Sequence, residues 1–301
     1  MRQLVAGSRG SKLAMIQTQS IINDLGSNVK IKKISTKGDK ITDVALSKVN
    51  GKGFFTREID NALLKGEIDF AVHSLKDLPT KLPAGLTIAA IPKRELPNDA
   101  LVGPYKNLAE LPENAKVGTS SLRRQAELLK YRPDLNIIDL RGNIDTRIHK
   151  LSEGKYDAII VAVAGLIRLG YEDYHILSPN HFIPAVCQGA IAVTSRNDDD
   201  DVLKIMSKIE DPLTRYICNA ERNFLITLNA GCQIPVGVFS KINIIKKVYN
   251  IKGFISSIDG QKFIEGKMKS SISNAKNTAI NLAHNLLNSG GSQILESIRN
   301  G

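Results

Sequence analysis

Four polar or charged turns follow directly after short apolar runs that are predicted to be strands. The run Leu4–Ala6 is followed by GSRGS, and the run Ile68–Val72 by HSLKD. Lys116-Val117 leads into GTSSLRR, and Ile137–Leu140 leads into RGN. Ligands of open α/β sheets bind outside the carboxyl ends of the strands. The four turns therefore predict a single binding cleft, which could lie between two α/β domains.

The segment GTSSLRR is the most informative of these turns. A Thr or Ser caps a predicted helix with apolar positions at Leu122, Ala126 and Leu129, so Arg123 and Arg124 fall in its first turn. Cations there oppose the helix dipole at a cost of ~0.3–1 kcal/mol each, and a broken local rule often marks a functional site. Arginine also binds planar carboxylates through two parallel hydrogen bonds. The pair predicts a site for a ligand with several carboxylates or phosphates; the alternative is two solvated arginines on a surface helix.

The HSLKD turn offers a carboxylate among cations. One interpretation of Asp77 is structural, as the partner of Lys76 in an ion pair or as a helix N-cap. The other is functional, as a carboxylate that faces a positive charge developing during a reaction. Lys76 could form a Schiff base, although its sequence neighbours do not show that it is desolvated. His73 is interpreted as a packed, hydrogen-bonded strand residue rather than a base.

The three cysteines are widely spaced and form neither a disulfide framework nor a CxxC metal site. Cys187 and Cys218 are interpreted as small buried hydrophobic residues. Cys232 differs, because it lies in NAGCQIPVG, a glycine-containing loop after a helix from which a thiol can reach a cleft. The cysteine usage favours a reducing, cytoplasmic location, and no metal site is expected.

Composition excludes several classes of protein. The 301 residues are 42% hydrophobic and 24% charged, which is ordinary for a globular protein and excludes extensive disorder. No stretch approaches the ~20 apolar residues of a membrane helix, and no signal peptide is expected. The net charge of +11 suits nucleic acid, an anionic membrane or an acidic small molecule, and partly reflects a lysine-rich surface. With 5% aromatic residues and no Trp, the chain offers few platforms for stacking single-stranded nucleic acid.

The order of apolar segments predicts an α/β fold followed by a smaller domain. Short runs rich in β-branched residues alternate with helical patterns from the N-terminus as far as Ala190–Thr194. This alternation is typical of sheets that helices cover on both faces. Pro92 and Pro97 bracket a plausible crossing between two α/β domains. After a helix that ends before Gly231, the pattern indicates an antiparallel sheet with a turn at Asp259-Gly260, then a final helix.

These segments together resemble the porphobilinogen deaminases, also called hydroxymethylbilane synthases. The resemblance runs from end to end and includes GSRGSKLAMIQ, KVNGKGFFTREID, DFAVHSLKDLPT, VGTSSLRRQ, LRGNIDTR, AGLIRLG, PAVCQGA and NAGCQIPVG. It implies two doubly wound domains like those of periplasmic binding proteins, at 1–93 with 190–208 and at 97–189. A third, α+β domain at 212–301, with a three-stranded antiparallel sheet and helices, would carry the cofactor cysteine.

The resemblance also implies a specific reaction. The family joins four porphobilinogen molecules head to tail, releases ammonia at each step, and frees hydroxymethylbilane by hydrolysis, as part of heme and other tetrapyrrole biosynthesis. The chain grows on a dipyrromethane cofactor attached by a thioether, and Cys232 matches the attachment position. Asp77 matches the catalytic carboxylate, which would hold pyrrole N–H groups and stabilise the cationic azafulvene. The pyrroles carry acetates and propionates, which accounts for the arginines.

The remaining site residues are carried over by their match to family motifs. The carboxylate-binding or catalytic positions are Arg9, Arg123, Arg124, Arg141, Arg147 and Arg168. The positions expected to contact cofactor or substrate through other groups are Ser11, Gln17, Ser74, Lys76, Thr119, Ser121, Gly142 and Gln188, while Lys48 and Lys52 match a loop over the cleft. Arg9 and Arg147 are expected to serve coupling and translocation. A charge-assisted hydrogen bond contributes ~1.5–3 kcal/mol, so loss of one arginine should slow a step that uses it by roughly ten- to a hundredfold.

The sequence departs from the family at Cys187, where the family usually has Gly. If that position needs a left-handed backbone, Cys carries strain; if it is only closely packed, Cys is tolerable. The alternative to the transferase is a non-catalytic bilobal anion-binding protein, and nucleic-acid binding through the net charge is a third hypothesis. The protein is expected to act as a monomer in the cytoplasm, with porphobilinogen as its small-molecule partner. Neither nucleic acid nor a membrane is expected to take part.

Overall fold

The computed structural model describes residues 3–26, 28–36, 56–231 and 234–300. The described chain divides into two compact units. The first comprises Met1–Glu95, Ile167–Gly170 and Gly189–Arg215, and the second comprises Leu96–Leu166, Tyr171–Gln188 and Tyr216–Gly301. The chain thus leaves the first unit and returns to it twice. The division into three domains, at 1–93 with 190–208, 97–189 and 212–301, stays a prediction.

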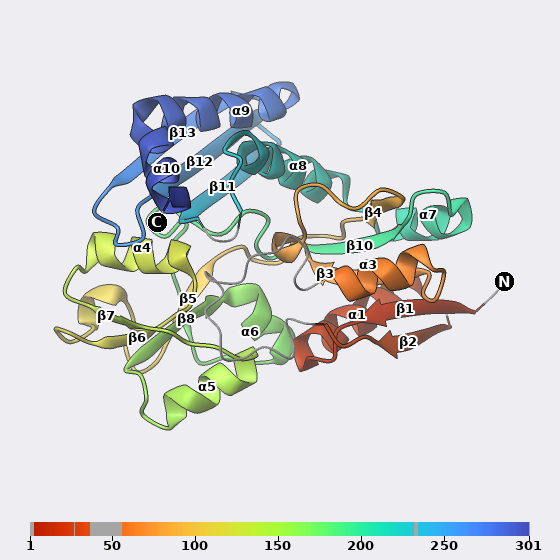
Figure 1. The fold of residues 1–301 in the computed structure, drawn as a ribbon, viewed down its shortest axis with the longest axis horizontal. Coiled ribbons are helices and arrows are strands. Elements are labelled where there is room, and N and C mark those ends of the chain that lie inside the picture. The colour runs from red at the N-terminus through yellow and green to blue at the C-terminus, as the bar shows by residue number, and fades with distance from the viewer. Residues whose placement is uncertain (1–2, 27, 37–55, 232–233, 301) are drawn as a thin grey trace. The chain divides into compact units, whose positions relative to one another are not determined.

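The first unit is built on a mixed five-stranded sheet in the order β2-β1-β3-β10-β4 (Figure 1). β1 pairs in parallel with β2 and β3, whereas β10 runs antiparallel to both β3 and β4. The strands are β1 Leu4–Ser8, β2 Val29–Lys33, β3 Phe70–Ser74, β4 Leu86–Ala90 and β10 Ile191–Arg196. The accompanying helices are α1 Lys12–Leu25, α3 Arg57–Leu64 and α7 Asp200–Met206.

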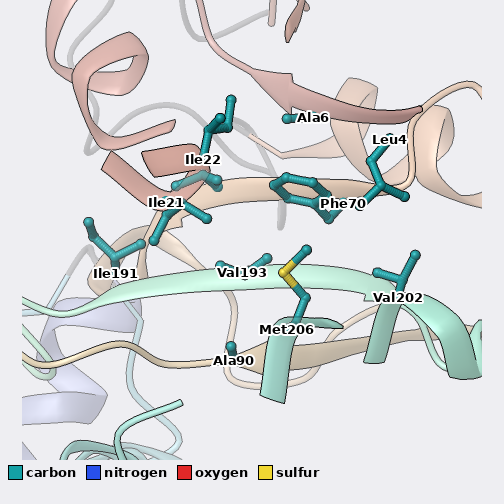
Figure 2. Packing of buried hydrophobic residues seen from close by; sticks show 11 residues of the cluster. Leu4, Ala6, Ile21, Ile22, Phe70, Ala90, Ile191, Val193, Val202 and Met206 are labelled. Atoms are coloured by element: carbon teal, nitrogen blue, oxygen red, sulfur yellow. The ribbon is translucent and has the colours of Figure 1, made fainter. Parts of the chain in front are cut away.

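Apolar side chains from these strands and helices form one buried cluster. Phe70 of β3, Val193 of β10, Ile21 of α1 and Met206 of α7 belong to this cluster (Figure 2). One face of α1 is apolar, because Ile21 is buried and Leu25 packs against the same cluster. Burial of both faces explains why β1 and β3 are nearly continuous apolar runs.

The second unit contains a sheet with the same pattern, in the order β7-β6-β8-β5-β9. β6 is parallel to β7 and β8, and β5 is antiparallel to β8 and β9. The strands are β5 Asp99–Val102, β6 Lys116–Gly118, β7 Asn136–Ile138, β8 Ala158–Ala162 and β9 His175–Ile176. The helices are α4 Leu122–Tyr131, α5 Ile144–Ser152 and α6 Val163–Leu169, whose last turn falls in the first unit. The two sheets confirm the expectation of two mixed α/β sheets.

The second unit also holds the predicted small sheet, which is antiparallel in the order β11-β12-β13. Its strands are β11 Val236–Asn243, β12 Val248–Ser256 and β13 Phe263–Ser271, and its helices are α8 Pro212–Thr227, α9 Ala275–Leu286 and α10 Ser292–Asn300 (Figure 1). The turn at Asp259-Gly260 is confirmed. Gly260 has φ 72°, and a Cβ there would meet the Ala126 carbonyl oxygen at 2.5 Å, so this approach to α4 requires glycine.

A search of the described residues finds no helix with the length and apolar character needed to span a membrane.

Candidate active site

The first group of predicted site residues lies at one edge of the first sheet. β1 and β3 are parallel neighbours, so the turns that follow them start from the same edge. Ser11 caps α1, accepting a hydrogen bond from the Ala14 amide at 3.3 Å. Gln17 on α1 donates from Nε2 to Ser74 Oγ at 3.2 Å, which ties the helix to the end of β3. The structure therefore brings Gln17 and Ser74 together within the first unit, and places Ser11 at the start of the helix that carries Gln17.

Lys76 and Asp77 follow on a single 3-10 turn, Leu75–Asp77. Leu75 is fully buried and anchors this turn, whereas Asp77 is exposed to solvent. A solvent-facing carboxylate at a strand end is suited to meet a charge on a ligand. Lys76 is half-buried.

His73 lies directly before this turn and is buried. Its Nε2 is 3.0 Å from Thr194 Oγ1, which confirms that it is a packed, hydrogen-bonded strand residue. Burial, and secondarily the charge of Arg9, lowers the pKa of His73 to about 4. The imidazole is therefore neutral at pH 7, so Arg9 provides positive charge at this end of β1 while His73 provides none.

The second group lies at the ends of β6 and β7 in the second unit. Ser120 joins the two turns, because its Oγ donates to the Leu140 carbonyl at 2.7 Å and accepts from the Leu140 amide at 3.1 Å. The Thr119 amide donates to the Ile138 carbonyl at 3.0 Å, and Thr119 is itself buried. Sequence reasoning missed Ser120, although it stands in the same motif as Thr119 and Ser121.

The next three predicted residues lie in the turn after β7 and in helix α5, which follows it. Arg147 donates from Nε to the Gly142 carbonyl at 2.8 Å, and Arg141 Nε lies 3.3 Å from Asp139 Oδ2. Gly142 has φ 110°, and a Cβ there would lie 2.8 Å from Thr146 Cγ2, so only glycine fits. The structure thus links Arg147 of α5 to the turn that carries Arg141 and Gly142.

Arg123 and Arg124 are 5% and 6% exposed, so the alternative of two solvated surface arginines is wrong. Ser121 caps α4 as predicted, accepting from the Arg124 amide at 3.5 Å. Both guanidiniums bind the carboxylate of Asp99, which begins β5. Sequence reasoning missed this partner, because Asp99 precedes an apolar run on a strand that was not predicted. Binding of a ligand anion by the two arginines stays a proposal.

Glu127, one turn along α4, is the second buried carboxylate of this group. It accepts from Arg123 Nη1 at 2.9 Å and also from the Ile183 amide. Burial raises the pKa of Glu127 to about 8, although Arg123 acts in the opposite direction. For Asp99, the two arginines together outweigh burial and lower the pKa to about 2. At pH 7 the four side chains therefore hold two guanidinium charges against one full carboxylate charge and a mostly neutral acid.

Gln188 and Arg168 are fixed by hydrogen bonds within their own units. Gln188 Nε2 donates to the carbonyls of Pro97 and Asn98 and, at 3.0 Å, to Asp99 Oδ1. Arg168 Nη2 donates to the Gly189 carbonyl at 2.8 Å, and burial lowers its pKa. Gln188 therefore belongs to the Asp99 group, whereas Arg168 belongs to the first unit.

Cys187 adopts a left-handed backbone with φ 57°, which decides between the two expectations for this position. Its amide donates to Glu221 Oε2 at 2.7 Å, and its Sγ lies 3.5 Å from the Cys218 carbonyl. Cys187 and Cys218 are buried free thiols, as predicted. Cys232, Lys48 and Lys52 lie outside the described residues.

Comparison with known proteins identifies the family. One family model, "Porphobilinogen deaminase, dipyromethane cofactor binding domain", matches residues 4–204, and "Porphobilinogen deaminase, C-terminal domain" matches residues 215–288. The chain belongs to the porphobilinogen deaminase family. Similar curated members are the porphobilinogen deaminases of Carboxydothermus hydrogenoformans, 46% identical over 99% of this chain and 98% of the relative, and of Syntrophomonas wolfei, 47% identical over 98% of each.

Solved structures are similar at much lower identity. One is the second substrate binding domain of a putative amino acid ABC transporter from Streptococcus pneumoniae, 12% identical, with a TM-score of 0.43 over 75% of this chain and 98% of that one. Another is a putative methionine-binding lipoprotein from Bacillus subtilis, 13% identical, with a TM-score of 0.41 over 71% and 93%. Because both scores are low, the fold assignment rests on the strand order of the sheets.

The side chains described here fit the cofactor that the family model names. A dipyrromethane that carries acetates and propionates needs cationic and hydroxyl donors, and both kinds gather at the strand ends of each unit. The buried Nε of Arg123 has no hydrogen-bond partner among the described residues, so the second unit retains an unused donor.

Proposed function

We propose that this chain joins four porphobilinogen molecules head to tail, releasing ammonia at each step, and then releases hydroxymethylbilane by hydrolysis. The observation that carries the proposal is the match of residues 4–204 to the cofactor-binding domain of the family, together with arginine-bearing turns at the strand ends. The dipyrromethane, when bound, supplies the free pyrrole carbon to which the first substrate is added. The products are precursors of heme and other tetrapyrroles.

Cys232 is the proposed point of covalent attachment, through a thioether. It stands in NAGCQIPVG directly after α8, whereas Cys187 and Cys218 are buried inside the second unit. A buried thiol without access to substrate is inert, which leaves Cys232 as the candidate.

The arginines are proposed to bind the carboxylates of the cofactor and of the growing chain. Arg9 and Arg168 contribute from the first unit, and Arg123, Arg124, Arg141 and Arg147 from the second. Ser11, Ser74, Thr119, Ser121 and Gly142 add hydrogen bonds at the same turns, with Lys76, Gln17 and Gln188 beside them. Lys48 and Lys52 are proposed to contact substrate as well. A guanidinium matches a carboxylate through two parallel hydrogen bonds, which orients each ring as well as binding it.

Asp77 is the proposed catalytic carboxylate. Its exposed position beside Lys76 allows it to face pyrrole N–H groups and to stabilise positive charge that develops as ammonia leaves. The enzyme is proposed to act as a monomer in the cytoplasm, on porphobilinogen.

The test is the intact mass of the purified full-length chain. We expect a covalent excess equal to two linked pyrrole units, absent from Cys232→Ser and retained in the control variant Cys187→Gly. An unmodified, folded wild-type chain that acquires no adduct when given porphobilinogen contradicts the proposal and supports a non-catalytic anion-binding protein.

Asp77→Asn separates catalysis from cofactor attachment. The variant should carry the cofactor or part-built chains, seen by intact mass, yet turn over porphobilinogen at least a hundredfold more slowly, because the amide provides no negative charge. Product formation near the wild-type rate would refute the assigned role.

A further inference from the structure

Asp99 occupies the centre of the buried arginine pair. It is fully buried at the start of β5. Its Oδ2 lies 2.7 Å from Arg123 Nη1, and its Oδ1 lies 2.7 Å from Arg124 Nη2 and 2.9 Å from Arg124 Nε. One carboxylate therefore spans two guanidiniums that are adjacent in the sequence.

Each guanidinium also donates to a backbone carbonyl. Arg124 Nη1 donates to the Ile160 carbonyl of β8 at 3.0 Å, and Arg123 Nη1 donates to the Ile183 carbonyl at 2.8 Å. Charge-assisted hydrogen bonds in a buried setting are strong and directional. The orientation of both planes is thus determined by Asp99 together with two backbone carbonyls.

Asp99 also accepts a hydrogen bond from a residue outside the arginine pair. Gln188 Nε2 donates to Asp99 Oδ1 at 3.0 Å, and the preceding amide, that of Cys187, donates to Glu221 on α8. Glu221 also accepts from the amide and hydroxyl of Ser240 on β11. A continuous set of hydrogen bonds therefore links Asp99 to the C-terminal sheet.

The charges leave this cluster able to accept an anion. The buried Nε of Arg123 has no hydrogen-bond partner among the described residues, and burial raises the pKa of Glu127 to about 8, which reduces the negative charge beside the arginines. A buried excess of positive charge is costly unless an anion neutralises it. A carboxylate of a bound ligand would supply that charge.

We propose that Asp99 is a positioning residue for the reaction: it holds Arg123 and Arg124 in the orientation that receives carboxylates of the dipyrromethane, without contacting the pyrroles itself. The inference rests on the proposed function, in which these arginines bind the cofactor. It assigns a role to a carboxylate that the sequence motifs do not include.

The test compares Asp99→Asn with Asp69→Asn in the full-length chain. Asp69 is a matched control, because it is also a buried carboxylate near an arginine, Arg196, but it belongs to the first unit, whereas the arginine pair belongs to the second. Cofactor-free protein of each kind is given porphobilinogen, and the rate of gain of two pyrrole units is followed by intact mass. We expect the half-saturating porphobilinogen concentration to rise about tenfold in Asp99→Asn, with the maximal rate within threefold of wild type.

Asp69→Asn, which affects stability alone, should leave that half-saturating concentration unchanged. If Asp99→Asn fails to fold, Asp99→Glu answers the question, because it keeps the negative charge and displaces the carboxylate from the two guanidiniums; we then expect a rise of about threefold. The inference is overturned if the variant that folds has the same half-saturating porphobilinogen concentration as wild type. A wild-type chain that gains no adduct overturns the proposed function instead.

Discussion

At the scale of single residues, Cys187 shows how one side chain is kept in an unfavourable backbone conformation. Its φ of 57° is in the left-handed region, which costs an L-residue other than Gly about 1–2 kcal/mol. The hydrogen bond from its amide to the buried carboxylate of Glu221, at 2.7 Å, holds that conformation in place. The strain is therefore local and is offset by a contact that a glycine would also make.

Two substitutions at this position isolate the strain. Both Cys187→Gly and Cys187→Ala remove the thiol, but only glycine accepts the left-handed backbone without cost. We expect Cys187→Gly to be more stable than Cys187→Ala by about 1 kcal/mol in urea denaturation. Equal stability of the two variants would show that the position is not strained.

Glu127 should make stability depend on pH. The folded protein keeps the Glu127 proton up to a pKa of about 8, whereas the unfolded chain releases it near 4.5. The folded state therefore binds more protons across this window, and its stability falls as pH rises from about 5 to about 8. The free energy of unfolding of wild type relative to Glu127→Gln should fall over that range, by at most about 1.4 kcal/mol per pH unit.

Urea denaturation at pH 5, 6, 7 and 8 measures this difference. His73, with a pKa lowered to about 4, has the opposite effect between about pH 4 and 6.5. Both proteins contain His73, so its contribution cancels in the comparison. A constant difference between the two proteins would mean that Glu127 is ionised in the folded state.

Sequence reasoning found the arginine turns but not the carboxylates that bind them. Arg9, Arg123, Arg124 and Arg141 stand just after strands, and the position of such residues in a sheet follows from strand polarity. Asp99 meets Arg124 only because β5 pairs with β8, a contact between strands some 60 residues apart that no local pattern specifies. Burial of the arginines is a consequence of that pairing.

At the scale of elements, the ends of β6 and β7 are held together by a single hydroxyl. Ser120 Oγ satisfies both the amide and the carbonyl of Leu140, at 3.1 and 2.7 Å. Leu140 is fully buried, so these backbone groups have little access to water. The turn that carries Arg141 therefore depends on this serine for its position.

Ser120→Ala should lower the free energy of unfolding by about 1–3 kcal/mol, because it leaves two backbone groups without their partner. Chemical denaturation measures the change. Ser152→Ala, which removes a single bond from an exposed hydroxyl to the His149 carbonyl, is the control and should change stability by less than about 0.5 kcal/mol. A similarly small effect of Ser120→Ala would show that water replaces the hydroxyl.

The predicted elements were those with long apolar runs. β1, β3, β10 and the antiparallel C-terminal sheet are confirmed, because burial on one or both faces leaves a clear pattern in the sequence. No strand was assigned to β2, whose sequence VKIKK is mostly lysine, or to β5, whose four buried residues follow a proline by one residue. Short segments of this kind become strands because a neighbouring strand is available to pair with them.

At the scale of the whole molecule, the first unit cannot form from a continuous stretch of chain. Among the strands that the structure describes, β4 pairs only with β10, which comes from residues 191–196. A fragment of residues 1–95 therefore lacks the strand that joins β3 to β4.

We expect the 1–95 fragment to show no cooperative thermal transition by circular dichroism. Addition of a peptide covering residues 189–215, which supplies β10 and α7, should restore one. The full-length chain serves as the reference for a cooperative transition. Cooperative unfolding of the fragment alone would contradict this dependence on β10.

The place of β10 in the chain also has a consequence during synthesis on the ribosome. About a hundred residues separate β4 from β10, which at ~5–20 residues per second is a delay of roughly 5–20 s. Throughout that interval the nascent β3 and β4 have no partner for their facing edges, and unpaired strand edges attract other chains. Yield in a heterologous host should therefore depend on translation speed and on chaperones that shield the emerging N-terminal third.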